Sequence, residues 1–210
     1  MLTPSPCEKH IMSASRLSTL LTTIDDINNE DPNTVQLSDG SEQAKEYVYG
    51  HHMSACLTQY WPEANEYLQI AVRAQHIKRW HLLRSDFDLG KTGYFKWRKA
   101  LGKFHAELTH SLMLEQIHSE AYTEEEAEQT SAIIRKEKLK TSTDSQTLED
   151  VACLVFLQHY FDEFAAKHSE DKIVRILQKT WGKMSDKAHD VALSLTLPDH
   201  LAKLVSKALS

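Results

Sequence analysis

The sequence predicts an all-α protein, a compact single domain built as a bundle of about eight helices. Three observations support this. Apolar residues recur at helical spacing through most of the chain, only 6 glycines and 5 prolines interrupt 210 residues, and no segment is a persuasive strand. A chain of this length can fill one core and is short for two. We expect a helical domain over residues 14–209, after a flexible N-terminal segment at residues 1–13.

The first four helices are predicted from apolar stripes between clear breaks. Asn29-Glu-Asp-Pro-Asn33 ends the first helix, and residues 35–41 are expected to form a loop that turns at Asp39-Gly40. Residues 81–93 form a second long loop. The expected helices span residues 14–28, 42–60 and 62–80, with a long fourth helix from about residue 94 through Leu112.

The second half of the chain predicts four or five more helices. Thr123-Glu-Glu-Glu126 is a capping box that starts the fifth. The sixth, over residues 148–166, is apolar nearly all round over one and a half turns and is therefore expected to be central. A seventh carries Ile173, Ile176 and Leu177 on one side, and two short helices follow, the last opened by Pro198.

Charge and cysteine content exclude several classes of protein. The net charge is −6, which argues against nucleic acid and anionic membranes as partners, because both favour a basic surface. The longest apolar run, residues 151–157, is too short to span a bilayer, and the N-terminus does not resemble a signal peptide. No Cys-x-x-Cys pair indicates zinc or redox chemistry. We expect a cytoplasmic protein, and the sequence assigns no oligomeric state.

Two acidic residues, Glu149 and Asp150, directly precede the most apolar run of the chain. Carboxylates so close to a core need a cation, a metal or backbone donors. Thr147-Leu-Glu-Asp150 also fits a capping box, so a helix cap is an equal alternative, and the two roles are compatible.

Histidines provide the second group of candidates. His76 lies beside the buried face of the third predicted helix, and His51 lies on the apolar stripe of the second, so it is expected to point inward. His105 lies beside the stripe of the fourth, two residues before Glu107. Neutral imidazoles with a carboxylate suit a divalent metal, although a lone histidine beside a core is more often structural.

Cations interleaved with aromatic residues form the third group. Arginine forks and aromatic faces suit a phosphate or a nucleotide, whereas the competing interpretation is a solvated helix surface with ordinary core aromatics. No glycine-rich phosphate loop is present. The candidate binding residues are Gln75, Arg79, Trp80, Arg84, Tyr94, Trp97, Arg98, Arg135 and Lys136.

From about Thr19 to Leu195 the chain resembles an uncharacterised bacterial and fungal family known as a domain of unknown function. The resemblance is carried by residues 74–80, 84–85, 93–98, 135–137, 148–157 and 179–181. Some fungal members are labelled glutamyl-tRNA synthetase. That label needs a nucleotide-binding α/β fold, which the sequence does not predict, and the glycine expected after His76-Ile77 is Lys78.

The order of the candidate residues is also remotely similar to the His-Asp (HD) superfamily of metal-dependent phosphohydrolases. That resemblance implies an HD-domain-like fold and one divalent metal ion, which could be manganese, magnesium, zinc or iron. His51 would match the first histidine and Asp150 the last aspartate. Gln75-His76 stands where a His-Asp doublet is expected, so one carboxylate is lost, and His105 or Glu149 could compensate.

Together these features predict a degenerate HD-like phosphohydrolase acting on a small nucleotide or phosphate ester. His51, His76, His105 and Asp150 would hold the metal, which would activate a bound water. Glu149 or Glu107 would be the general base, and the arginines would neutralise charge on the phosphoryl oxygens. The alternative is a binding protein without catalytic activity, which retains the same pocket for an anionic metabolite.

Overall fold

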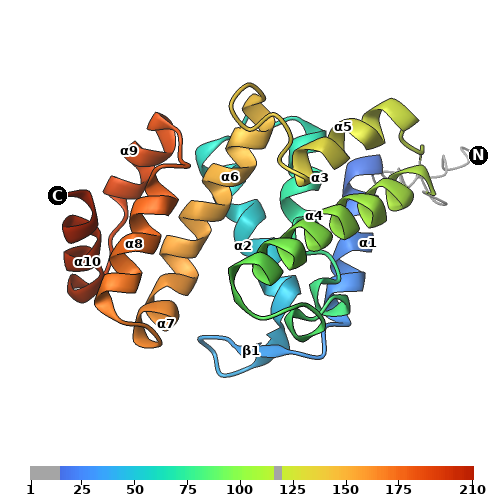
Figure 1. Cartoon of the computed structure of the whole chain (residues 1–210). Helices are drawn as coiled ribbons and strands as arrows, with labels where there is room; N and C mark the ends of the chain where they lie inside the picture. The colour runs from blue at the N-terminus through green and yellow to red at the C-terminus, as the bar shows by residue number, and fades with distance from the viewer. Residues whose placement is uncertain (1–14, 116–119) are drawn as a thin grey trace, which may run out of the picture.

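The computed structural model describes residues 15–115 and 120–210, and within them the chain is mostly helical, with one small hairpin (Figure 1). The described part contains ten α-helices, so the predicted mostly helical single domain is confirmed. The expected flexible segment at residues 1–13 lies outside the described residues. The helices are α1 (Arg16–Asn29), α2 (Lys45–Tyr60), α3 (Glu66–Ala74), α4 (Gly90–Leu114), α5 (Glu124–Ile134), α6 (Thr143–Val155), α7 (Phe161–Ala166), α8 (Glu170–Trp181), α9 (Asp186–Ser194) and α10 (Asp199–Leu209).

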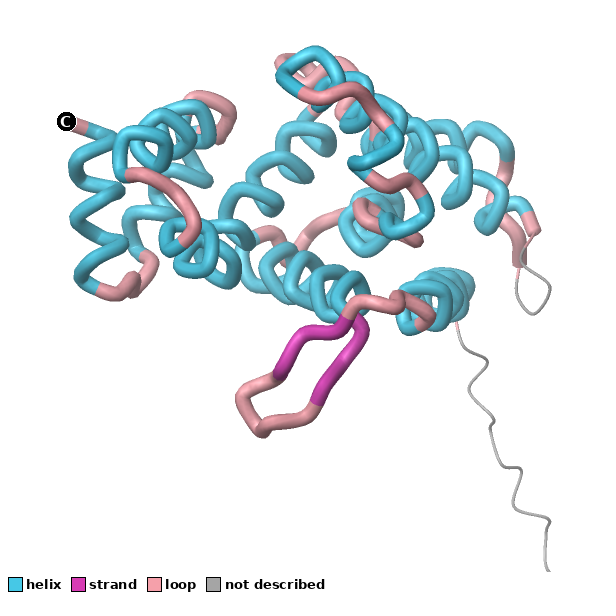
Figure 2. The backbone as a smooth tube through the Cα atoms, turned by 60° about the horizontal axis from the view of Figure 1, so that its bottom comes forward, coloured by secondary structure: helices cyan, strands magenta, loops and turns pink. Residues whose placement is uncertain are grey.

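The expectation of no strand is wrong at one place. Strands β1 (Thr34–Gln36) and β2 (Glu42–Ala44) pair antiparallel with Val35 opposite Gln43, and Gly40 turns the chain with a φ of +85°. Three residues per strand are too few for an alternating pattern to be visible in the sequence. The hairpin projects from the helical body (Figure 2) and delivers the chain to the start of α2.

The helices pack in two groups that are joined by α6 and the π-helical turn after it. Helices α1 to α6 surround the larger core, to which α3 contributes Leu68, Ile70 and Val72, all nearly inaccessible to solvent. The π-helical turn Phe156–Tyr160 continues α6 into α7, which packs with α8 and α10 around a smaller core. In Figure 1 this second group forms the end of the molecule that carries the C-terminus. Helix α6 contacts α2, α3, α5 and α9, which confirms the prediction of a central helix.

Three predicted boundaries differ from the structure in ways that move candidate residues. Helix α3 begins after the N-cap Asn65 and ends at Ala74, so the segment from Gln75 onward forms tight turns in place of another helical turn. Helix α6 begins after the N-cap Ser142, so the capping-box interpretation of Thr147 is wrong. Glu149 and Asp150 therefore lie in the second turn of α6. The capping box of Thr123 and Glu126 on α5 is confirmed.

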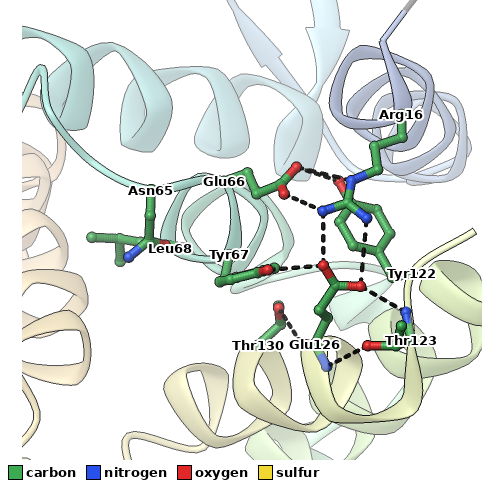
Figure 3. Close-up of polar contacts among 9 residues, drawn as sticks. All are labelled: Arg16, Asn65, Glu66, Tyr67, Leu68, Tyr122, Thr123, Glu126 and Thr130. Atoms are coloured by element: carbon green, nitrogen blue, oxygen red, sulfur yellow. Dashed lines mark hydrogen bonds and ion pairs between the residues drawn. The ribbon is translucent and has the colours of Figure 1, made fainter. Parts of the chain in front are cut away.

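A network of charged and phenolic side chains joins α1, α3 and α5 (Figure 3). The guanidinium of Arg16 hydrogen-bonds the carboxylates of Glu66 and Glu126, with 2.8 Å from Nη2 to Glu126 Oε1, and lies 4.1 Å from the ring centre of Tyr122. Tyr67 donates to Glu126 over 2.9 Å and Tyr122 to Glu66 over 3.1 Å. The hydrogen bonds from Arg16 and Thr123 lower the pKa of Glu126 to about 2. We call Arg16, Glu66, Tyr67, Tyr122 and Glu126 the Arg16 cluster.

Candidate anion-binding cleft

A cleft of about 450 Å³ collects side chains from most of the larger helical group and from α8. Lys45, Glu46 and Tyr49 come from the first turns of α2, and Glu149 comes from α6. The remaining charged and polar lining residues are Gln75, His76, Arg79, Tyr94, Arg98, Cys153, Tyr160, Thr180, Lys136 and Lys183. Five cations thus face two carboxylates across this cleft.

Two residues with left-handed backbone help to position cations of the cleft. Lys78, just before Arg79, has a φ of +49°, and Lys136 has a φ of +55°. Residues other than glycine adopt this conformation at a cost, and such residues cluster at functional sites. The buried side chain of Asn28 stabilises the first, because its Oδ1 accepts a hydrogen bond of 3.0 Å from the amide of Lys78.

Glu46 and His76 form a hydrogen-bonded pair inside the cleft, with 3.0 Å between Glu46 Oε2 and His76 Nδ1. The ring of Tyr49 stacks on His76 at 3.9 Å between centroids. Burial raises the pKa of Glu46 to about 7, against the opposing effect of Arg79 and Lys45. Glu46 is therefore poised to gain or lose a proton near neutral pH.

The cleft is electropositive at His76. Burial holds the pKa of this imidazole well below its usual range, and the nearby charges of Arg79, Arg98, Lys136 and Lys45 lower it further. The ring is neutral at pH 7. When Glu46 is ionised, Nδ1–H donates to it, and Nε2 then carries a free lone pair.

The arginines of the cleft differ in how they are held. Arg79 lies 3.8 Å from Glu46 and stacks over Trp97, with 4.9 Å from its guanidinium carbon to the ring centre. Trp97 donates its indole N–H to the carbonyl of Leu82 over 3.0 Å, so it is a support for Arg79. Arg98 is exposed and, among the described residues, has no carboxylate within ion-pair distance.

Helix α6 separates the two predicted carboxylates. Glu149 faces the cleft and accepts hydrogen bonds from Lys136 and, over 3.1 Å, from Lys183, which hold its pKa at about 2 despite burial. Asp150 is one residue further, about 100° around the helix, and faces α9. There it accepts from the amide of Ser185 over 2.8 Å, at the N-cap of α9, and from Gln146.

The predicted metal ligands do not come together. His51 is partly exposed and pairs with Asp25 at 3.3 Å, outside the cleft, because the buried stripe of α2 carries Glu46, Gly50 and Met53 and not the stripe expected from the sequence. Among the residues with described positions, no group of three histidines, cysteines or carboxylates could hold a metal ion. His51, Asp150, His76 and His105 therefore do not fit a single divalent ion.

Other predicted residues have roles in the fold. Arg84 donates to the backbone carbonyls of Phe87 and Asp88, both over 2.9 Å, and so fixes the loop before α4. Glu107 is exposed and pairs with Lys103, far from any role as a base in the cleft. Trp80 does not line the cleft.

His105 is buried, with 2 % exposure, and its ring centre lies 6.0 Å from that of His76. It lines a second, neighbouring cavity of about 310 Å³, which also contains Arg135. Its Nε2 has no hydrogen-bond partner in the described structure.

Several lining residues were not predicted from the sequence. Lys45, Glu46 and Tyr49 reach the cleft because the hairpin sets where α2 begins. Phe156 and Tyr160 both line the cleft from the π-helical turn, a geometry that often marks functional sites. One signal in the sequence could have identified Glu46. This residue precedes the small Gly50 by four residues and the apolar Met53 by seven, so all three lie on one face of the helix.

The sequence profile of one family, described as a domain of unknown function (DUF4202), matches residues 18–205. The chain belongs to this family. The match covers every residue that lines the cleft and most of α10. No curated protein and no solved structure matches the chain. Among the described helices, none is both long enough and apolar enough to cross a membrane.

Proposed function

We propose that the chain binds a small anionic molecule, of which a phosphorylated metabolite is the best candidate, in the cleft between α2, α4, α6 and α8. The observation that carries the proposal is the charge of the lining. Lys45, Arg79, Arg98, Lys136 and Lys183 surround Glu46 and Glu149, and Glu46 is only partly ionised at neutral pH. Charge left over in a concave site favours a ligand of opposite sign.

The donors also suit an oxyanion. A guanidinium offers a planar fork of N–H groups, and hydrogen bonds between ionised groups are about twice as strong as neutral ones. Arg79 is held in place by Trp97 and Glu46, whereas Arg98 is free to turn toward a ligand. One fixed and one adjustable arginine can hold two oxygens of the same phosphoryl group.

The test uses sulfate and inorganic phosphate as probes, with calorimetry and thermal unfolding. We expect either anion to raise the melting temperature of the wild type, as a ligand of the folded state must. Arg98→Met should weaken binding by roughly 10-fold, from the loss of one charge-assisted hydrogen bond. Lys103→Met, an exposed cation on the same helix outside the cleft, is the matched control. Equal binding by both variants would exclude the cleft.

A second candidate is hydrolysis of a phosphate ester, favoured by the Glu46–His76 pair. With Glu46 ionised, the free Nε2 of His76 can accept a proton from an attacking water, and the cleft arginines can neutralise the phosphoryl oxygens. The likeness to the HD superfamily also stays a proposal. In its favour, α6 does supply a carboxylate to the cleft of His76, although it is Glu149 and not Asp150.

Dependence on a divalent ion stays a prediction without an assembled set of ligands among the described residues. Phosphate release from a panel of phosphate esters, with and without manganese, tests both versions of the hydrolase. We expect His76→Gln to abolish release and to retain sulfate binding. No release by the wild type would remove the hydrolase proposal and leave the binding function intact.

A further inference from the structure

The second cavity differs from the cleft in its charge. It is lined by five cations, Arg79, Arg98, Lys99, Arg135 and Lys136, and by no carboxylate among the described residues. The cleft, in contrast, includes Glu46 and Glu149. Arg135 is offset by Glu128 and Glu137, at 2.6 and 2.7 Å, which lie outside the lining. The second cavity is thus the more purely basic of the two.

The two cavities are neighbours with a common wall. Gln75, His76, Arg79, Arg98 and Lys136 line both of them. The shared cations can therefore bind an anion on either side, or bridge two linked anionic groups that occupy one cavity each. Phe95, which is exposed, and Leu101 give the second cavity an apolar side, and the buried His105 lies behind it.

Charge alone sets the number of anionic groups that the pair of cavities can take. The cleft has three cations in excess of its two carboxylates, and Lys99 adds one more in the second cavity, where Glu128 and Glu137 already balance Arg135. A single phosphoryl group carries at most two negative charges near neutral pH. A ligand with one phosphoryl group leaves part of this excess positive charge without a counter-ion. A ligand with two linked phosphoryl groups can neutralise the cations of both cavities.

The cleft also has an uncharged side. Ala152, Phe156, Ile176 and Tyr160 line it from α6, α8 and the π-helical turn. Such surface suits an organic group and gives no favourable contact to a bare anion. The organic part of a ligand therefore belongs in the cleft, and its anionic end belongs toward Arg98 and Lys99.

We infer that the ligand is an organic diphosphate, with one phosphoryl group beside Arg79 and Lys136 and the next in the cavity of Lys99 and Arg135. This rests on the proposed function, because it assigns the ligand class of the same site. The cations that line both cavities contact non-bridging oxygens of both phosphoryl groups. A single phosphoryl group occupies only half of the basic lining.

The test compares inorganic phosphate with methylenediphosphonate, a diphosphate mimic that cannot be hydrolysed, by calorimetry at constant ionic strength. We expect the wild type to bind the diphosphonate at least about 10-fold more tightly, since each additional charge-assisted contact contributes about that factor. The double variant Lys99→Gln/Arg135→Gln should lose most of this advantage and keep its affinity for phosphate within about 2-fold.

Lys45→Gln is the matched variant, because Lys45 lines the cleft and not the second cavity. It should weaken both probes by a similar factor. Thermal unfolding of each variant shows that it is folded. Equal affinity of the wild type for both probes, or equal losses in the double variant, would overturn the diphosphate assignment and leave anion binding standing. If neither probe binds, the proposed function fails with it.

Discussion

The Arg16 cluster and the cleft both concentrate charge between helices, but they balance it differently. In the cluster, one guanidinium lies between two carboxylates, and two phenols donate to those same carboxylates. In the cleft, five cations face two carboxylates, and Arg98 lacks an ion-pair partner in the described part of the chain. A network that is complete within the protein needs nothing else, whereas the incomplete one has capacity for a ligand.

The backbone follows the same division. The cluster joins regular helices, and its acceptor Glu126 is part of an ordinary capping box. Next to the cleft the chain adopts left-handed φ at Lys78 and Lys136 and a π-helical turn at residues 156–160. Strain costs stability and persists where the surrounding structure enforces it, often at functional sites. The cluster therefore contributes stability, whereas the backbone beside the cleft carries a conformational cost.

Arg16→Met should give the largest effect that distinguishes the Arg16 cluster from the cleft. Its removal leaves Glu66 and Glu126 facing each other without their cation, in a site where all three side chains are less than a third exposed. We expect a loss of about 2 kcal/mol in the free energy of unfolding, between the values for exposed and for fully buried ion pairs that lose one partner. Urea denaturation measures this loss, and sulfate affinity should be unchanged.

Arg175→Met is the control for that variant, because Arg175 is an exposed arginine on α8 with no ion pair among the described contacts. It should change stability by less than about 0.5 kcal/mol. If Arg16→Met weakened sulfate binding as strongly as Arg98→Met, the two regions would be one coupled system and their functional separation would be wrong.

Glu46 tests the cleft side of the comparison through pH. Its pKa is about 7 in the folded protein and near 4.5 in the unfolded chain, so the folded state retains a proton that the unfolded chain has released. The resulting stabilisation is complete below about pH 4.5 and is lost as the pH rises through about 7. Between pH 5 and pH 8 the wild type should therefore lose roughly 2 kcal/mol relative to Glu46→Gln.

Sulfate, whose charge is constant in this range, reports the same event in binding. Ionisation of Glu46 adds a negative charge beside Arg79, so wild-type affinity should fall as the pH rises through about 7. Glu46→Gln should show a flatter profile. His76 and His105 are present in both proteins, so their own titration largely cancels in the difference. Parallel pH profiles for the two proteins would contradict the assignment of this carboxyl group.

The sequence predicted the scaffold well because helical periodicity and caps are local signals. The capping box at Thr123 and the central position of the helix that carries the apolar run 151–157 follow from neighbouring residues alone. The hairpin was missed because its strands have three residues each. The second helix was given the wrong buried stripe, which pointed His51 inward and left Glu46 unnoticed.

The site was predicted in part. The residues that were placed in it correctly differ in their tertiary contacts from those that were not. Gln75, His76, Arg79, Arg98 and Glu149 do meet, because each lies near a helix end or on a face that packs toward the same cleft. Asp150 and Arg84 do not, since their carboxylate and guanidinium are used by backbone groups of α9 and of the loop before α4. Sequence spacing shows that a polar side chain lies near a core, but the identity of its partner depends on tertiary packing.

The neighbours Glu149 and Asp150 give the finest test, because they differ by one position on α6. Asp150→Asn should replace one of the two carboxylate oxygens that accept from the amide and hydroxyl of Ser185, the N-cap of α9, with an NH2 donor. It should cost about 1–2 kcal/mol, with sulfate binding unchanged. Glu149→Gln should instead free Lys136 and Lys183 and tighten sulfate binding by a few-fold. Urea denaturation and calorimetry on both variants measure the two effects. If manganese raised the melting temperature of the wild type and not that of Asp150→Asn, Asp150 would be a metal ligand, as the sequence predicted. The excess of cations in the cleft would then not be the only basis for ligand binding.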